Sequence, residues 1–338
     1  MKVFKNIFFL AVVTFFIACG GDESEPATTD GTVVIPPKTV KVPIFNKDTA
    51  YHYVAKQVSF GPRVPNSQAH KDCANWLVSE FKNMGLTVVE QDFVAKAYTG
   101  ENLQSKNIIA SINPAAKNRI LLCAHWDSRH IADQDDDISR QKEAILGADD
   151  GGSGVGILLE VGRTLAKDSL GIGVDLVLFD SEDYGAPSGE SGGADSWCLG
   201  SQYWGKNPHV VGYKARFGIL LDMVGEKSPR FPMEATSMNY APELMTKVWD
   251  LAHDMGMAMY FDKTKVGGVT DDHLYVNKLT GIPTIDIINL EGSKNGSFGA
   301  HWHTHGDNMD VISKNTLAAV GQLMLKVVYL ENANQFAF

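Results

Sequence analysis

Apolar residues recur along most of this chain with the spacings of helices and strands. From Asn66 to Met84 they follow a helical period, with Asn66 or Ser67 as the N-cap and Gly85 as the stop signal. After that helix, strand-like apolar runs lie at 86–94, 106–112, 119–124, 173–179, 216–221 and 282–288. Further helical stretches lie near 153–167, 241–256 and 314–331. This alternation predicts an α/β fold with a mixed, mostly parallel central sheet and helices on both of its faces.

The first 44 residues have a different pattern from the rest of the chain. Lys2 and Lys5 precede an apolar run at 7–18 that is too short to span a bilayer, so residues 1–18 are predicted to be a secretory signal peptide. The run ends before Cys19 in a sequence that resembles a bacterial lipoprotein cleavage box, with an ordinary signal peptide and a chance cysteine as the alternative. Residues 19–44 are rich in Gly, Pro, Thr and acids, which is typical of a flexible tether. We therefore expect an exported lipoprotein, anchored to a membrane through Cys19 on the periplasmic or cell-surface side, with a single folded domain at 45–338.

The composition narrows the classes of function. The 338 residues include 40 acidic and 30 basic side chains, a net charge of −10 that disfavours a nucleic-acid binder. Without the two lysines of residues 1–18 the count is 40 against 28, or −12. Four cysteines, none in a CxxC pair, are too few for a disulfide scaffold, and since Cys123 lies in an apolar run, Cys73–Cys198 is the one disulfide available. Any metal ion must therefore be held by His and carboxylate side chains.

Acidic and imidazole side chains follow the predicted strands at the points where those strands end. Such residues are candidates because ligands bind beyond the carboxyl ends of the strands in open α/β sheets. They are His125 and Asp127 after 119–124, Glu182 and Asp183 after 173–179, Asp222 after 216–221, and His301, His303 and His305 after 282–288. The turn GADDGGSG at 147–154 adds Asp149 and Asp150 and opens a helix. Each acid alone is typical of a solvated turn, but together they predict a divalent-metal site of oxygen and nitrogen ligands, most naturally for zinc.

Three other motifs match known signatures only in part. The turn at 147–154 lacks the third glycine of a dinucleotide-binding loop and the Lys-Ser/Thr of a P-loop. The GxSxG match at 189–193 begins about nine residues after a strand, so it is interpreted as a loop and not as a nucleophile elbow. Asp133, Asp135 and Asp137 imitate the start of an EF-hand, but Ile138 and Ala144 stand where Gly and Glu are required. That run is interpreted as a solvated acidic loop over the site.

Taken in order, these residues resemble the zinc-dependent exopeptidase clan that contains two-zinc bacterial aminopeptidases and the animal-type glutaminyl-peptide cyclotransferases, or glutaminyl cyclases. The resemblance runs from about residue 53 to 330. Three features match the cyclase branch: the segment FGPRVPNS at 60–67, the triplet Asp-Asp-His at 271–273, and Trp302 before His303. One departure is Asp183, because animal cyclases carry Glu-Glu where this chain has Glu182-Asp183. Asp is one methylene shorter than Glu, so a metal must lie closer to the backbone or be held differently.

The resemblance implies a zinc-exopeptidase-like fold and a role for each candidate. One zinc ion per chain would be bound by Asp150, Asp183 and His303. Glu182 would act as the proton shuttle, its pKa raised by the surrounding carboxylates. Asp222 and Asp271 would share a proton and hold the reacting amide nitrogen, with a purely structural pair as the alternative.

The same resemblance implies which residues surround the substrate. Trp302 would form a wall of the pocket, with Phe298 and Trp197 as further substrate-binding candidates, although aromatic residues are as often core. His125 and Asp222 would form a vestigial second metal site. Spacing alone does not distinguish His303 from its neighbours His301 and His305; the family pattern selects it.

The implied reaction converts N-terminal glutamine of peptides or proteins to pyroglutamate and releases ammonia, with zinc polarising the γ-carbonyl group. The alternative is a two-zinc aminopeptidase that hydrolyses N-terminal residues with Glu182 as the base. A binding or scaffold protein with a degenerate site is disfavoured, because every position that carries chemistry is filled. The expected partners are peptides or proteins with N-terminal Gln and a membrane, with no nucleic acid, and the chain is expected to be a monomer.

Overall fold

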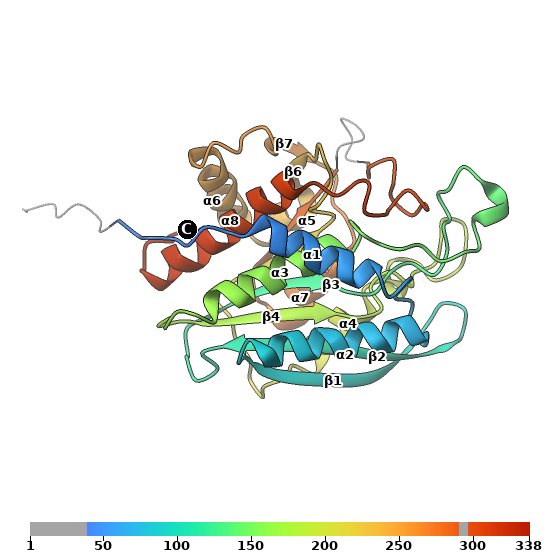
Figure 1. Ribbon diagram of the computed structural model, residues 1–338, viewed down its shortest axis with the longest axis horizontal. Coiled ribbons are helices and arrows are strands. Elements are labelled where there is room, and N and C mark those ends of the chain that lie inside the picture. Colours follow the sequence, from blue (N-terminus) through green and yellow to red (C-terminus); the bar gives the residue numbers. More distant parts are fainter. Residues whose placement is uncertain (1–38, 291–296) are drawn as a thin grey trace, which may run out of the picture. The chain divides into compact units, whose positions relative to one another are not determined.

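A six-stranded sheet forms the centre of the structure, a computed structural model that describes residues 39–290 and 297–338 (Figure 1). Its strands are β1 (Thr87–Lys96), β2 (Asn102–Ile112), β3 (Arg119–His125), β4 (Gly173–Phe179), β5 (Gly218–Asp222) and β8 (Thr284–Ile288). They lie in the order β1-β2-β4-β3-β5-β8. The β1–β2 and β2–β4 pairs are antiparallel, and β4, β3, β5 and β8 run parallel to one another. The predicted mixed, mostly parallel sheet is confirmed, and all six predicted strand runs form it.

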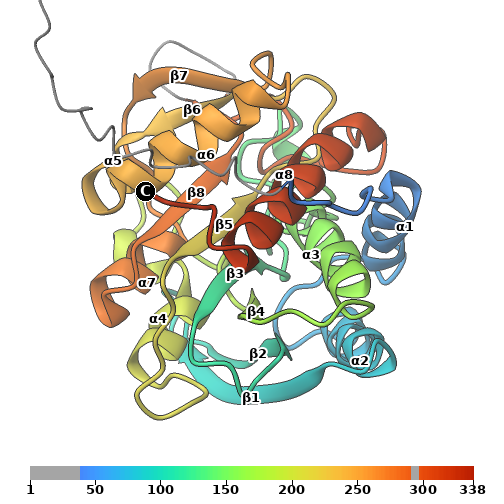
Figure 2. The ribbon, with the colours of Figure 1, turned by 90° about the vertical axis from the view of Figure 1, so that its left-hand side faces the viewer.

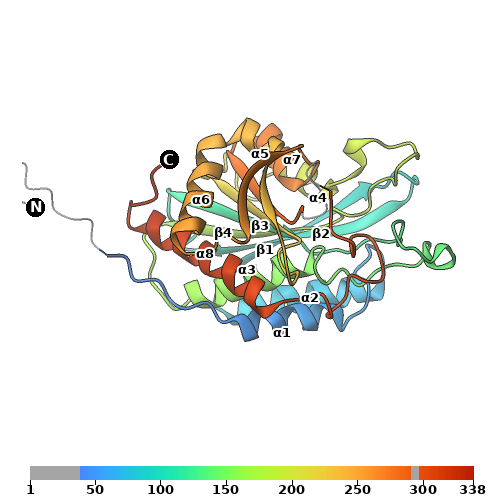
Figure 3. The ribbon, with the colours of Figure 1, turned by 90° about the horizontal axis from the view of Figure 1, so that it is seen from above.

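Helices cover both faces of this sheet (Figures 2 and 3). One face carries α1 (Lys47–Val58), α2 (Gln68–Asn83), α3 (Gly152–Leu165) and α8 (Lys314–Asn332). The other face carries α4 (Leu199–Lys206) and α7 (Asp272–Thr280). Beyond β8 lie a two-stranded parallel sheet and its helices: β6 (Phe231–Glu234), β7 (Phe261–Val266), α5 (Ala235–Tyr240) and α6 (Pro242–Asp254). Short 3-10 turns occupy Ile138–Arg140 and Ala194–Ser196.

The alternation of side chains along β3 explains why both faces are covered. Leu122 and Ala124 belong to the large apolar core beneath α1, α3 and α8. Leu121 and Cys123 point the other way, into a smaller core that contains Trp204 of α4. All are fully buried, because side chains alternate between the two faces of a strand and here both faces are packed against helices.

The ends of the helices agree with the sequence in part. Ser67 caps α2 by accepting a hydrogen bond from the backbone of His70 at 3.1 Å, which decides between the two predicted caps. Asn66 has a left-handed backbone, φ 74°, and its side chain instead contacts the β2 segment, for example Gln104 N at 2.8 Å. The sequence did not predict α1, α4, α5, α7 or the small second sheet, whose apolar positions are too few or too short in extent for a periodic signal.

The predicted signal peptide, Cys19 and most of the predicted tether lie outside the described residues. Within the described parts, no helix has the length and apolar character needed to cross a membrane. Cys73, Cys123 and Cys198 are buried free thiols, so the Cys73–Cys198 disulfide that the sequence allowed is not formed.

Candidate active site and metal centre

The carboxyl ends of the parallel strands open onto one cavity of about 380 Å³. This volume is typical of a small-molecule site, since such sites span about 300–1,000 Å³. The cavity is lined by the ends of β4 and β5, by the turn before α3 and by the loops before α4, before α7 and after β8. Its lining includes Asp150, Glu182, Asp183, Trp197, Asp222, Asp271, Phe298, Trp302 and His303. Every residue to which the resemblance gave a role lies in this lining except His125, which contacts Asp150 and Asp222 of the lining.

Asp150, Asp183 and His303 form one cluster of potential metal ligands, with one atom from each lying within 4.8 Å of the others. His303 Nε2 lies 3.2 Å from Asp183 Oδ1 and 3.8 Å from Asp150 Oδ2. Asp183 Oδ2 is buried and has no hydrogen-bond partner among the described residues. Although burial opposes it, Asp183 and Asp133 raise the pKa of His303, so the surroundings favour positive charge at this ring. An oxygen-rich cluster with a free buried carboxylate oxygen and one imidazole fits a zinc ion.

A second cluster shares Asp150 with the first. His125 Nε2 lies 3.0 Å from Asp150 Oδ1 and 3.2 Å from Asp222 Oδ1. The predicted second-site residues His125 and Asp222 therefore lie together, with Asp150 between the two clusters. Gly151, in a left-handed turn at φ 81°, permits this approach, because a Cβ there would lie 2.8 Å from both Asp127 O and His125 Cε1.

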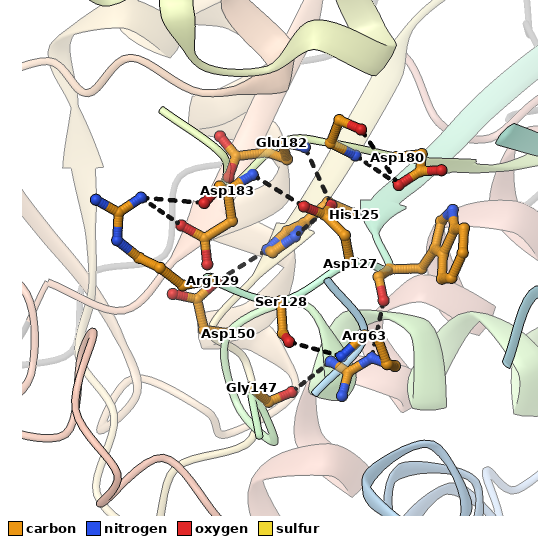
Figure 4. Close-up of polar contacts among 12 residues, drawn as sticks. Arg63, His125, Asp127, Ser128, Arg129, Gly147, Asp150, Asp180, Glu182 and Asp183 are labelled. Atoms are coloured by element: carbon orange, nitrogen blue, oxygen red, sulfur yellow. Dashed lines mark hydrogen bonds and ion pairs between the residues drawn. The ribbon is translucent and has the colours of Figure 1, made fainter. Parts of the chain in front are cut away.

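Two further carboxylates hold the turns that carry the ligands, and one of them is visible in Figure 4. Asp127 accepts hydrogen bonds from the backbone N–H groups of Glu182 and Asp183, at 3.0 and 3.1 Å. Asp307 does the same for the preceding turn, accepting from Asp149 N at 2.7 Å and Asp150 N at 3.1 Å. Each turn with two consecutive acids is thus fixed by a third, buried acid. Asp307 was not among the residues predicted from the sequence.

Glu182 lies at the edge of the cavity beside both clusters and is 8% exposed. Burial raises its pKa well above the ordinary value, and repulsion from nearby carboxylates adds to the increase, while His125 opposes it. Burial therefore raises the pKa of Glu182 more than the surrounding carboxylates do, although the carboxylates alone were the predicted cause. The Cys198 thiol donates a hydrogen bond to Glu182 Oε1 at 2.9 Å. A carboxyl group whose pKa is raised in this way is suited to general acid and base catalysis.

Comparison with known proteins identifies the fold. Residues 107–328, well over half of the chain, match the sequence pattern of peptidase family M28. The chain belongs to peptidase family M28. A Zn-dependent exopeptidase from Parabacteroides distasonis is 49% identical, with a TM-score of 0.83 over 86% of this chain and 99% of that one. The predicted zinc-exopeptidase-like fold is therefore confirmed.

Glutaminyl cyclases are among the similar proteins of family M28. The glutaminyl cyclase of Porphyromonas gingivalis is 50% identical, with a TM-score of 0.81 over 85% of this chain and 98% of that chain. The glutaminyl-peptide cyclotransferase of the snake Boiga irregularis is 24% identical over 257 residues, which cover 68% of this chain and 66% of the relative. The chain thus spans about two thirds of the length of that curated relative. The predicted resemblance to the cyclase branch of the clan is confirmed.

On this M28 scaffold, Asp222 and Asp271 face the same cavity. Burial raises the pKa of Asp222 to about 8, and repulsion from Asp271 and Asp150 contributes. Asp286, a fully buried acid on β8, was not among the predicted residues; its pKa is raised well above the ordinary value by burial and then by Asp271 and Asp222. An acid within the apolar strand TIDII is the signal that could have revealed it, because charged residues are rarely buried without a function or partner.

The predicted aromatic residues surround His303. Trp302 stacks on His303 with ring centres 3.6 Å apart, and Phe298 stacks on Trp302 at 4.3 Å. Trp197 lies nearly parallel to the His303 ring, at 5.8 Å and 7°. The structure therefore places Trp302, Phe298 and Trp197 in the cavity wall of the M28 site rather than in the core.

The interpretation of residues 133–137 as a solvated loop is wrong for two of its acids. Asp133 Oδ1 lies 2.6 Å from Arg129 Nε and 3.2 Å from His303 Nδ1. Asp135 accepts hydrogen bonds from His305, at 2.9 Å from its backbone nitrogen and 2.7 Å from Nδ1. The sequence pattern could not reveal the contacts with His303 and His305, because each histidine lies 170 residues from its acid along the chain. Asp136 and Asp137 are exposed, as expected for a solvated loop.

The remaining sequence motifs have structural positions that agree with their interpretation. Residues 189–193, the GxSxG match, lie exposed in the loop between β4 and α4. His301 forms an ion pair with Asp149, with Nε2 2.9 Å from Oδ2, and His305 pairs with Asp135. His301 also belongs to a cluster of potential metal ligands, with Asp149 and Glu226, so the choice of His303 continues to rest on the family pattern.

Several residues at the edge of this site have left-handed backbones that side chains rarely adopt. Ser181, Cys198, Met223 and His303 have φ angles of 55°, 57°, 47° and 56°. All four lie next to or within the cavity lining, where such strain is retained because it directs neighbouring side chains into a site.

Proposed function

We propose that this chain is a glutaminyl-peptide cyclotransferase that converts N-terminal glutamine to pyroglutamate and releases ammonia. The observation that carries the proposal is Glu182, a nearly buried acid with a raised pKa at the edge of an aromatic-walled cavity beside a three-ligand metal cluster. Identity of 50% to the glutaminyl cyclase of Porphyromonas gingivalis over 85% of this chain supports the same substrate class.

Asp150, Asp183 and His303 would hold the metal, and one zinc ion per chain is proposed. When bound, zinc supplies a Lewis acid that polarises the side-chain carbonyl group of the substrate glutamine. The residues of the chain supply the remaining elements of the reaction. The aromatic wall of Trp302, Phe298 and Trp197 confines the glutamine side chain near its own α-amino group.

Proton transfer is assigned to Glu182. The α-amino nitrogen forms a bond to the side-chain carbonyl carbon, and the carbon–nitrogen bond of the amide breaks. Glu182 accepts the proton that the amine loses and donates it to the departing amide nitrogen, which leaves as ammonia. The carboxylate returns to its starting state, so one residue serves both steps.

Asp222 and Asp271 are proposed to bind the amide nitrogen during the reaction. Burial raises the pKa of Asp222 to about 8, which favours its protonated form in the metal-free protein, so this acid can donate a hydrogen bond to the reacting nitrogen. The pair would thereby stabilise the nitrogen as it gains a proton from Glu182.

The experiment that tests the function compares two substrates. Purified protein is assayed for ammonia release from glutaminyl peptides and for free leucine release from leucyl peptides. Ammonia release without leucine release is expected. Release of leucine at a comparable rate would overturn the proposal in favour of the aminopeptidase.

The His125–Asp150–Asp222 cluster is the observation that favours a two-zinc aminopeptidase, because it could hold a second ion that shares Asp150 with the first. Zinc content distinguishes the two enzymes independently of substrate choice. One tightly held zinc ion per chain is expected for the cyclase, and two per chain would contradict it.

Export and anchoring through lipidated Cys19 are proposed from the sequence alone, as is the monomeric state. Cell fractionation tests the anchor, since the protein should be recovered with membranes and a Cys19→Ser variant should not. Recovery of both proteins in the soluble fraction would refute it. Sedimentation of the purified domain tests the monomer, which predicts one species of the mass of a single chain.

A further inference from the structure

The ion pair between Arg129 and Asp133 lies directly behind the proposed metal ligands. Its two side chains, 2.6 Å apart at Nε and Oδ1, are 0% and 15% exposed. Both belong to the segment that follows β3, which the sequence pattern presented as a loop. Burial of a guanidinium group is destabilising unless close contacts compensate for its lost hydration. The contacts of this pair therefore indicate what it is retained for.

Arg129 contacts a ligand residue and the aromatic wall at once. Its Nη1 donates to the backbone oxygens of Asp183 at 3.0 Å and Gly185 at 3.2 Å. The same nitrogen lies 3.4 Å from Asp183 Oδ1 (Figure 4). The guanidinium carbon lies 4.5 Å from the centre of the Trp197 ring, a cation–π contact. One side chain thus fixes the backbone and carboxylate of Asp183 and the ring of Trp197.

Asp133 contacts the ligand on the opposite side of the cluster. Its Oδ1 lies 3.2 Å from His303 Nδ1, close but not aligned as a hydrogen bond. The backbone of the next residue, Gln134, donates to His303 O at 3.2 Å. The other ring nitrogen of His303, Nε2, faces Asp183 and Asp150. The negative charge of a carboxylate beside the far nitrogen of a ligand histidine favours a proton on that nitrogen, which leaves the near nitrogen free to bind a metal ion.

We propose that Arg129 and Asp133 are positioning residues of the metal site, which together hold the short Asp183 and the His303 ring at one metal position. The pair links four segments of the chain: the loop after β3, the turn after β4, the segment before α4 and the loop after β8. The contacts of this pair provide the additional support that Asp183 requires, because its side chain is one methylene shorter than that of Glu. This inference rests on the ligand set given under Proposed function.

The test measures zinc affinity in Asp133→Asn and Arg129→Lys, by competition with a chromophoric chelator. Loss of such an outer contact weakens metal binding by about 10- to 100-fold, and that range is expected for both variants. Asp135→Asn is the matched control. Asp135 lies in the same loop and accepts a hydrogen bond from His305 Nδ1 at 2.7 Å, but His305 is not a proposed ligand. Its zinc affinity should stay within about twofold of the parent.

Two further measurements separate positioning from general structural support. In protein loaded with Co²⁺ instead of zinc, the visible absorption bands should shift in Asp133→Asn but not in Asp135→Asn. Arg129→Lys should also raise KM, because an ammonium group cannot stack on Trp197 as a planar guanidinium does. Thermal unfolding of the metal-free variants identifies any that do not fold. Asp133→Asn and Arg129→Lys each test the proposal independently, so the test needs only one of the two variants to fold.

The outcomes distinguish this proposal from the ligand assignment on which it rests. If His303→Ala loses zinc but Asp133→Asn and Arg129→Lys bind it as tightly as the parent, the ligand set stands and the positioning role is refuted. If His303→Ala keeps parental zinc affinity, the ligand set is wrong and the positioning proposal fails with it. Equal weakening in Asp133→Asn and Asp135→Asn would also refute the specific role of Arg129 and Asp133.

Discussion

The ion pair between His301 and Asp149 should make the stability of the metal-free protein depend on pH. His301 is 7% exposed, and its Nε2 lies 2.9 Å from Asp149 Oδ2. Burial alone would lower its pKa, but the hydrogen bond to Asp149, the charge of Asp149, and the charges of Asp307 and Glu226 together raise it to about 9. His301→Gln is the appropriate change, because Gln keeps a donor for Asp149 but carries no charge.

The magnitude follows from the difference between the folded and unfolded pKa values of His301. The ordinary value is 6.5, and the folded value is about 9. At about 1.4 kcal/mol for each pH unit between them, protonation of the folded ring contributes about 3 kcal/mol. Because the folded pKa is the higher one, this contribution is fully present below about pH 6.5 and is lost as the pH rises through about 9.

The assay is urea unfolding of metal-free parent and His301→Gln protein at pH 6 and at pH 10. The free energy of unfolding of the parent should exceed that of the variant by about 3 kcal/mol at pH 6, and by much less at pH 10. Other groups that titrate in this range cancel in the comparison of the two proteins. A difference of the same size at both pH values would refute the argument from charge and leave only a packing effect.

Three other changes test the site and its support. Glu182→Gln should keep zinc and bound substrate but reduce kcat by about 10²- to 10⁴-fold in an ammonia-release assay; near-normal turnover would contradict the proton shuttle. Gly151→Ala should displace the turn of Asp150 and weaken zinc binding in a chelator competition, because a Cβ would lie 2.8 Å from Asp127 O at a left-handed φ of 81°. Asp175→Asn should lower the free energy of unfolding at pH 7 by about 3–5 kcal/mol, since it breaks the buried ion pair with Arg119 at 2.7 Å. Although burial opposes it, that pair lowers the pKa of Asp175, so its contribution is lost as the pH falls below about 4, and urea unfolding at pH 3 should show a smaller difference from the parent.

The sequence predicted those parts of the site that depend on local pattern. Apolar runs identify the strands, and a parallel sheet brings the residues after those runs to one edge. Asp150, Glu182, Asp183 and Asp222 therefore lie around one cavity, as expected from position alone. His303 needed the family pattern as well, because its loop carries three histidines at equal spacing.

Contacts between distant segments account for what the sequence could not predict. Asp133 and Arg129 were interpreted as part of a loop or left without a role, since their partners are Asp183, Trp197 and His303. Helix α7 has a short apolar pattern and was missed, although its N-cap is the candidate Asp271. A tertiary contact leaves no period in the sequence, so these residues become visible only in the folded structure.

The site contains more buried acidic side chains than a metal ion needs as ligands, and the structure gives the others a role. A metal centre built on turns must hold its ligands to within about 0.5 Å, and turns after strands are not rigid by themselves. Here each turn with two acids is held by one more buried acid, Asp127 or Asp307, through two backbone N–H groups. This arrangement brings negative charges together. Burial and then repulsion from Asp149 and Asp150 raise the pKa of Asp307 to about 7. A bound cation relieves that repulsion, so metal binding and the rigidity of the turns should reinforce each other. An acid near the cavity is therefore as often a support for a ligand as a ligand itself, and the two roles differ only in whether the carboxylate faces a backbone N–H or the cavity.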